Sequence, residues 1–163
     1  MRAFPTLNRS SRSSTLEVPA ARLWARAASA RGDDAGETWY ADAVPFKVRG
    51  GIDRLAGGEG RRWPLPDHDL LEVGDRAGFW EVVEVDHTAH RLAMVAAVRA
   101  PGTVRMELSV AGSGASSCVL TLAISFEPRG LLGTAYVVTD LPLREVVVEL
   151  THRRLLADIA AAV

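Results

Sequence analysis

Arg49, Asp53 and Arg54 form the first group of residues whose types and spacing could support chemistry. Arg49 and Asp53 are four residues apart, so on a helix the guanidinium and the carboxylate would lie on one face and could pair. Two interpretations stay open. The pair could point into an interior cavity and orient a polar group of a ligand, or it could fix a bend in its own helix.

A second group of charged residues lies on an alternating segment. Arg105 and Glu107 share the polar face of residues 103–110, which read as a strand because apolar and polar side chains alternate. If this face lines a cavity, Glu107 is a candidate ligand-binding or acid–base group. If it faces the solvent, both residues are ordinary surface charges.

Large, adaptable apolar side chains are the third feature. Aromatic rings of tryptophan and tyrosine combine an apolar body with one polar atom, and methionine fits irregular spaces, so these types suit the wall of a ligand cavity. Most such residues must still be ordinary core. The candidates for a cavity wall are Trp39, Tyr40, Trp80, Met94, Met106 and Tyr136.

Several familiar types of site are missing from the sequence. The glycine-rich segment 49–60 has neither the preceding strand of a dinucleotide-binding turn nor the lysine of a phosphate-binding loop. No serine lies in a Gly-x-Ser-x-Gly turn, and the four histidines have no metal-binding spacing. We therefore expect no metal and no cofactor, and these residues leave open whether a reaction is catalysed.

Composition narrows the classes of partner. The 19 basic and 20 acidic side chains are interspersed and give a formal net charge of −1, which does not favour a nucleic-acid partner. No apolar run approaches the roughly 18–20 residues that span a bilayer. Cys118 is the one cysteine and cannot form an internal disulfide, which fits a reducing cytoplasm. We expect a cytoplasmic monomer or homodimer.

The elements that position these groups follow from the patterning. Residues 1–14 are polar and low in complexity, which predicts a disordered leader, and residues 15–163 suffice for one domain with one core. A short strand is expected at 15–18. Helices are then expected from residue 20 to the glycine at 32, and from 38 to 55.

From residue 69 the period of the apolar side chains changes from that of a helix to that of a strand. Four long alternating segments joined by short turns indicate an antiparallel meander, with a further short strand at 70–73. Apolar residues at i, i+3 and i+4 spacing in 143–159 predict a long C-terminal helix. The expected α+β fold is a curved antiparallel sheet wrapped around that helix, with two shorter helices closing one end.

Two segments and four dipeptides carry a resemblance to a known family: Arg49–Gly58, Phe126–Tyr136, Trp39-Tyr40, Gly74-Asp75, Phe79-Trp80 and Pro101-Gly102. They are similar to one bacterial domain family of unknown function in the START-like (SRPBCC) superfamily, whose members share the helix-grip fold of the birch-pollen allergens. The resemblance covers about residues 18–160. The family is sometimes fused to a short-chain-dehydrogenase-like, NAD(P)-binding domain, which implies a dehydrogenase-like protein as a candidate partner.

The fold and the resemblance together suggest a function. We expect this chain to bind a small hydrophobic or amphipathic molecule in a cavity between the sheet and the C-terminal helix. Two alternatives stay open. One is a cyclase- or hydratase-like enzyme acting in the same cavity, for which Arg49, Asp53, Glu107 and Tyr136 are the residues to inspect. The other is a ligand-free interaction domain for a dehydrogenase-like partner.

Overall fold

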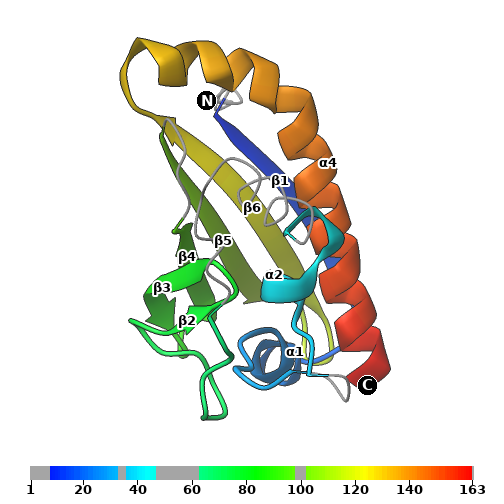
Figure 1. Cartoon of the computed structure of the whole chain (residues 1–163). Coiled ribbons are helices and arrows are strands. Elements are labelled where there is room, and N and C mark those ends of the chain that lie inside the picture. Colours follow the sequence, from blue (N-terminus) through cyan, green and yellow to red (C-terminus); the bar gives the residue numbers. More distant parts are fainter. Residues whose placement is uncertain (1–7, 33–35, 47–62, 98–101, 163) are drawn as a thin grey trace.

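A long twisted sheet and one long helix beside it make up most of the structure (Figure 1). The computed structural model describes residues 8–32, 36–46, 63–97 and 102–162, apart from the side chains of residues 130–141 and 162. The predicted α+β class, with a curved antiparallel sheet and a long C-terminal helix, is confirmed.

The sheet has six antiparallel strands in the order β1-β6-β5-β4-β3-β2. Strands β2 to β6 form the predicted meander, and the first strand of the chain forms one edge of the sheet by pairing with the last strand. Alternation of apolar and polar side chains makes these segments strands, because neighbouring side chains of a strand point to opposite faces. Their bounds are β1 (Arg9–Leu16), β2 (Arg76–Ala77), β3 (Trp80–Asp86), β4 (Arg91–Ala96), β5 (Gly102–Gly112) and β6 (Cys118–Pro128).

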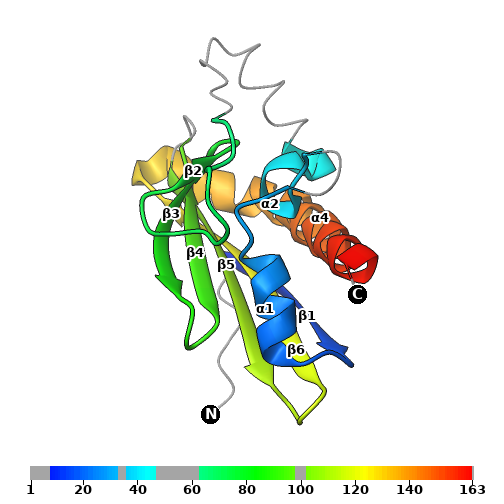
Figure 2. The same ribbon diagram turned by 90° about the horizontal axis from the view of Figure 1, so that it is seen from below.

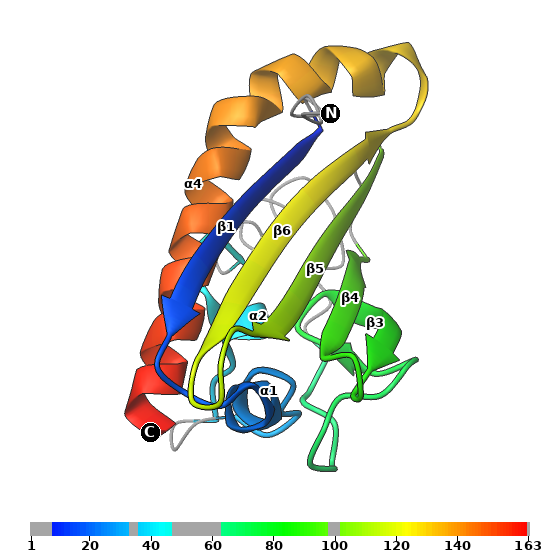
Figure 3. The same cartoon turned by 180° about the vertical axis from the view of Figure 1, so that it is seen from behind.

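Strand β1 corrects the expectation of a disordered leader for residues 9–14. All eight residues of β1 pair with β6, from Arg9 opposite Ser125 to Leu16 opposite Cys118. Serine and arginine side chains gave this segment the composition of a disordered tail. Its backbone groups nevertheless complete the ladder of β6, and Figure 3 shows β1 lying between β6 and α4.

Helix α4 (Gly130–Ala162) is longer than the predicted helix and begins directly after β6. It contains Pro142, and Figure 1 shows that the helix is bent. Val148, Leu155 and Ile159 are buried against the sheet and belong to the same core as the inward side chains of β4, β5 and β6. The predicted packing of the curved sheet against the final helix is therefore confirmed.

The two short helices lie on the same side of the sheet as α4 (Figure 2). Helix α1 (Ala20–Ala27) follows Pro19, whose fixed φ suits a helix start, and buries Leu23 and Trp24. Helix α2 (Trp39–Asp42) is capped by Thr38, whose hydroxyl accepts a hydrogen bond from the backbone N–H of Ala41 at 3.3 Å. Of the predicted helix over 38–55, residues 47–55 lie outside the described part of the chain.

The strand predicted at 70–73 is wrong. Leu70 makes a single antiparallel bridge with Ser29, and the strand that pairs with β3 is β2, a few residues later. Gly74, with φ of 96°, lies in the turn between them, a conformation that favours glycine. Within the described residues, no helix is both long and apolar enough to cross a membrane.

Candidate functional site

The two faces of the sheet have different chemistry. The face turned toward α4, which we call the inner face, carries Met106, Leu108 and Val110 of β5 and is buried. The opposite, outer face carries Arg105, Glu107 and Ser109 of the same strand. Because the side chains of a strand alternate, the register of β5 against β4 and β6 carries this division across the sheet.

Three of the predicted cavity residues meet on the inner face. Met94 of β4 is opposite Met106 of β5 in the register, and Val82 of β3 is opposite Met94, so Trp80 lies two residues along the same face. All are buried. Phe46 contacts the ring of Trp80 at 5.4 Å between centroids, with the planes at 77°. These side chains form an apolar wall on the inner face, and their part in binding a ligand stays a prediction.

The indole N–H of Trp80 is an unusual feature of this wall. The residue is 2% exposed, and its Nε1 has no hydrogen-bond partner among the described residues. A buried donor without a partner is uncommon in proteins and costs about 1–3 kcal/mol. The two other buried indoles differ, because Trp24 Nε1 donates to His87 Nδ1 at 3.2 Å and Trp39 Nε1 donates to the Ala27 carbonyl at 2.9 Å.

Trp39 and Tyr40 are buried on α2 and tie this helix to the end of α1. Besides the bond from Trp39, the Tyr40 hydroxyl donates to the Ser29 carbonyl at 3.1 Å. Burial raises the pKa of Tyr40 far above its ordinary value, so the phenol stays neutral. The polar atoms of both residues are therefore used inside the protein, and their part in a ligand cavity stays a prediction.

Helix α4 also buries side chains in this core. Thr151 lies on the same face of the helix as Val148 and Leu155, and all three are fully buried. The Thr151 hydroxyl has no hydrogen-bond partner within the described part of the chain. The sequence gave no reason to select it, because a single threonine within a helix has no distinctive pattern.

A polar seam joins α4 to β1 and was missed by the sequence reasoning. Arg12 pairs with Glu145 at 2.8 Å and with Glu149 at 2.9 Å. Beside it, Arg144 Nε donates to the Ser10 hydroxyl at 3.0 Å. Arg12 is separated from Glu145 by 133 positions in the sequence and from Glu149 by 137. These residues are in contact only because β1 lies next to α4. The seam attaches the first strand to the last helix.

His152 is buried on α4 near this seam. Desolvation lowers the pKa of its imidazole, and the charge of Arg12 acts in the same direction, against the opposing effect of Glu149. The Nε2 atom has no hydrogen-bond partner in the described residues. His152 is therefore a neutral side chain that was not among the predicted cavity residues.

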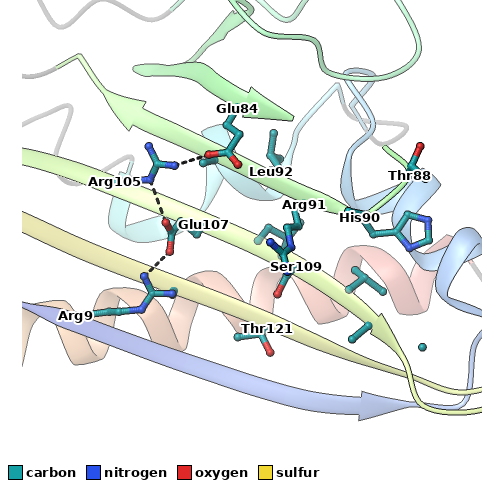
Figure 4. Close-up of a pocket in the computed structure, with 17 residues that line it drawn as sticks. Arg9, Glu84, Thr88, His90, Arg91, Leu92, Arg105, Glu107, Ser109 and Thr121 are labelled. Carbon is teal, nitrogen blue, oxygen red and sulfur yellow. Dashed lines mark hydrogen bonds and ion pairs between the residues drawn. The ribbon is translucent and has the colours of Figure 1, made fainter. Parts of the chain in front are cut away.

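Glu107 faces away from the interior, which corrects its selection as a candidate for the cavity between sheet and helix. It lies on the outer face of β5 and pairs with Arg9 and with Arg105, the latter at 3.1 Å (Figure 4). Desolvation raises the pKa of Glu107, but the hydrogen bonds from the two arginines outweigh it, so the pKa is lowered. A carboxylate held ionised in this way is a poor general acid or base.

The other predicted residues cannot be placed in the same way. Arg49 and Asp53 lie outside the described residues, and Tyr136 lies on α4 in the segment whose side chains are not described. No group of three or more His, Cys, Asp or Glu side chains that could hold a metal ion occurs among the described residues.

A family model matches residues 9–151, which is most of the sequence. Its description is "Protein of unknown function (DUF2867)". The chain belongs to this family. That description names no activity, so membership defines the protein's kinship and leaves its function open. None of the curated proteins matches the chain in sequence.

Solved structures place the family in the helix-grip fold. A protein from Nitrosospira multiformis is similar with a TM-score of 0.52 and 14% identity over 94% of both chains. Truncated norcoclaurine synthase from Thalictrum flavum has a TM-score of 0.51 and 12% identity, over 93% of this chain and 90% of that one. At such low identity the likeness shows the fold alone, and the predicted helix-grip fold is confirmed.

Proposed function

We propose that this member of the family binds a small amphipathic molecule in the interior between the inner face of the sheet and α4. The observation that carries the proposal is a pair of buried polar groups, one on the sheet and one on α4, that have no partner among the described residues. They are the indole N–H of Trp80 on β3 and the hydroxyl of Thr151 on α4.

The chemistry of these groups narrows the ligand class. An indole N–H only donates, so it calls for an oxygen or nitrogen acceptor, whereas a threonine hydroxyl can donate or accept. The surrounding Met94 and Met106 are apolar and adapt to irregular shapes. These features favour a molecule with an apolar body and one or two hydrogen-bonding oxygens over a pure hydrocarbon.

The proposal can be tested with Prodan, a neutral naphthalene fluorophore that carries one ketone oxygen. We expect saturable binding with a blue-shifted emission, because the dye moves from water into an apolar site. Trp80→Phe keeps an aromatic ring but removes the N–H, and should weaken binding about 5- to 10-fold, the value of one hydrogen bond.

Trp24→Phe is the matched control, because it makes the same chemical change at an indole whose N–H is already bonded to His87. It should leave the dissociation constant within about twofold of the wild type. Thermal unfolding of each variant checks that the fold is retained. If Prodan does not bind, or if the two tryptophan variants weaken binding equally, the proposed role of the Trp80 donor is wrong.

A further inference from the structure

A hollow of about 600 Å³ lies on the outer face of the sheet, on the side away from α4 (Figure 4). Its size is within the range of small-molecule sites. Three small side chains line it at outer-face positions: Ala93 of β4 and Ala123 of β6, which lie on either side of Glu107 in the register and are buried, and Ala111 of β5, two residues beyond Ser109. The large apolar side chains of these strands point to the other face, so the site is separate from the interior discussed above.

Charged side chains at one end of the hollow neutralise one another. Arg9 pairs with Glu107, Glu107 with Arg105, and Arg105 with Glu84 at 2.9 Å, in a chain that crosses the sheet (Figure 4). The two glutamates thus take up the charge of two of the three arginines that line the hollow. The third arginine, Arg91, has no hydrogen-bond or ion-pair partner among the described residues.

Asp86 is opposite Arg91 in the register but does not line the hollow. Its Oδ1 atom accepts hydrogen bonds from the backbone N–H groups of Thr88 at 2.9 Å and Ala89 at 2.8 Å. This carboxylate therefore holds the turn between β3 and β4. The guanidinium of Arg91 is left as the one positive charge in the hollow without a paired acid.

Two side chains with hydroxyl groups lie next to Arg91 on the neighbouring strands of the outer face. Ser109 of β5 is opposite Arg91, and Thr121 of β6 is opposite Ser109, so the three side chains share one line across the outer face. The Thr121 hydroxyl is bonded to that of Ser13 at 2.8 Å, which fixes its position. A guanidinium followed by hydroxyls offers several donors to one anion, and the planar fork of arginine matches a carboxylate.

His90 lines the end of the hollow that lies away from Arg9. Its φ is 52°, which is uncommon for a residue other than glycine, and its ring stacks on Trp24 at 5.5 Å between centroids. The stacking holds the side chain in place beside the turn, where Figure 4 shows it at the opposite end from Arg9. The hollow is thus bounded at both ends by fixed side chains.

We propose that this hollow is a binding site for a small organic monocarboxylate, with the carboxylate on Arg91 and Ser109 and the apolar body over the alanines. One uncompensated positive charge suits a single negative charge. The second charge of a dianion such as a phosphate monoester would find no uncompensated partner in the hollow, because Glu84 and Glu107 already pair with the other two arginines.

The test uses 2-naphthoate as the probe, with neutral 2-naphthamide and inorganic phosphate for comparison. In the full-length protein, amide chemical shifts measured by NMR should change on the outer-face strands β4, β5 and β6 as 2-naphthoate is added, and the changes should saturate. 2-Naphthamide has the same body without the charge, so it should bind about tenfold more weakly. Phosphate should cause no saturable change.

Variants assign the effect to the arginine. Arg91→Gln should weaken 2-naphthoate binding about tenfold, and Arg91→Lys should give an intermediate value because it keeps the charge but loses the fork. Arg153→Gln is the control, since Arg153 is an exposed arginine on α4 that pairs with Glu149 at 2.6 Å. It removes the same charge far from the hollow and should change the affinity less than twofold.

Three results would overturn the proposal. Equal binding by the wild type and Arg91→Gln would show that Arg91 is not the anchor. Saturable, Arg91-dependent binding of phosphate with equal affinity would make the site one for inorganic anions. Sedimentation showing a dimer that Arg91→Gln dissociates would mean that a second copy of the chain covers this face.

Discussion

His152 combines burial with a titratable ring, and this makes the residue sensitive to pH. Its ordinary pKa is 6.5, and burial lowers that value in the folded protein. As the pH falls below about 6.5, the unfolded chain takes up a proton before the folded protein does. The imidazole therefore contributes a loss of folding stability on acidification, beginning near pH 6.5.

Replacing His152 by glutamine should reduce this pH dependence. We expect the free energy of unfolding of the wild type to decrease between pH 7 and pH 5, and that of His152→Gln to decrease less, because glutamine does not titrate. Urea unfolding at a series of pH values measures both slopes. Equal slopes for the two proteins would show that His152 is protonated as easily in the folded state as in the unfolded chain.

Residue types alone indicated which of the candidates are buried, but not the orientation of the charged ones. Trp80, Met94 and Met106 are large and apolar, so burial on the inner face follows from their chemistry. For Glu107, alternation placed its side chain on the face of the strand that does not carry Met106. Whether that face lines a cavity or faces the solvent stayed open. Its pairing with Arg9 depends on a strand that the sequence did not predict.

At the scale of an element, the spacing of apolar residues in α4 predicted the helix but not which of its faces is buried. Apolar spacing in 143–159 correctly predicted a helix. The apolar residues are spread around the helix, however, and Leu143, Val146 and Leu150 are exposed, whereas Val148 and Leu155 are buried. A helix with apolar residues on more than one face does not reveal by its sequence which face packs on the sheet.

Two leucine-to-alanine substitutions on α4 test this assignment of faces. Leu155 is 0% exposed, so Leu155→Ala should destabilise the protein by about 2–5 kcal/mol through lost contacts and a cavity. Leu143 is 55% exposed, so Leu143→Ala should change stability by about 0.5 kcal/mol or less. Urea unfolding monitored by circular dichroism compares them. Similar losses for the two variants would contradict the assigned packing of α4.

At the scale of the whole molecule, β1 connects the beginning of the chain to its end. It pairs with β6 along its full length, and Arg12 joins it to two glutamates of α4. Without β1, strand β6 would have an unpaired edge of backbone N–H and C=O groups. The first strand is therefore integral to the helix-grip architecture.

Truncation tests the contribution of β1. A chain that begins at residue 15 lacks most of β1, whereas a chain that begins at residue 8 keeps it, including the hydrogen bond from Phe126 N–H to the Asn8 carbonyl at 2.8 Å. We expect the first to aggregate or unfold without cooperativity, and the second to unfold cooperatively in urea. Size-exclusion chromatography and circular dichroism provide the measurements. Cooperative unfolding of both chains at one urea concentration would show that β1 is dispensable.

The sequence by itself determined the local elements and the kinship of this protein. Alternating side chains specified the strands from β3 to β6, helical spacing specified α4, and motifs along the chain indicated a family of unknown function with the helix-grip fold. These features are local, because each depends on residues that are close neighbours in the chain.

Only the tertiary structure decided which residues share a site. The pairing of Arg12 with Glu145 and the outward orientation of Glu107 depend on contacts between segments distant in sequence. The pattern of apolar residues does not predict these contacts, because the sequence of β1 is polar and has the composition of a disordered tail. The energy that orders β1 comes from the ladder of β6 and the charges of α4, and these exist only once the rest of the chain has folded.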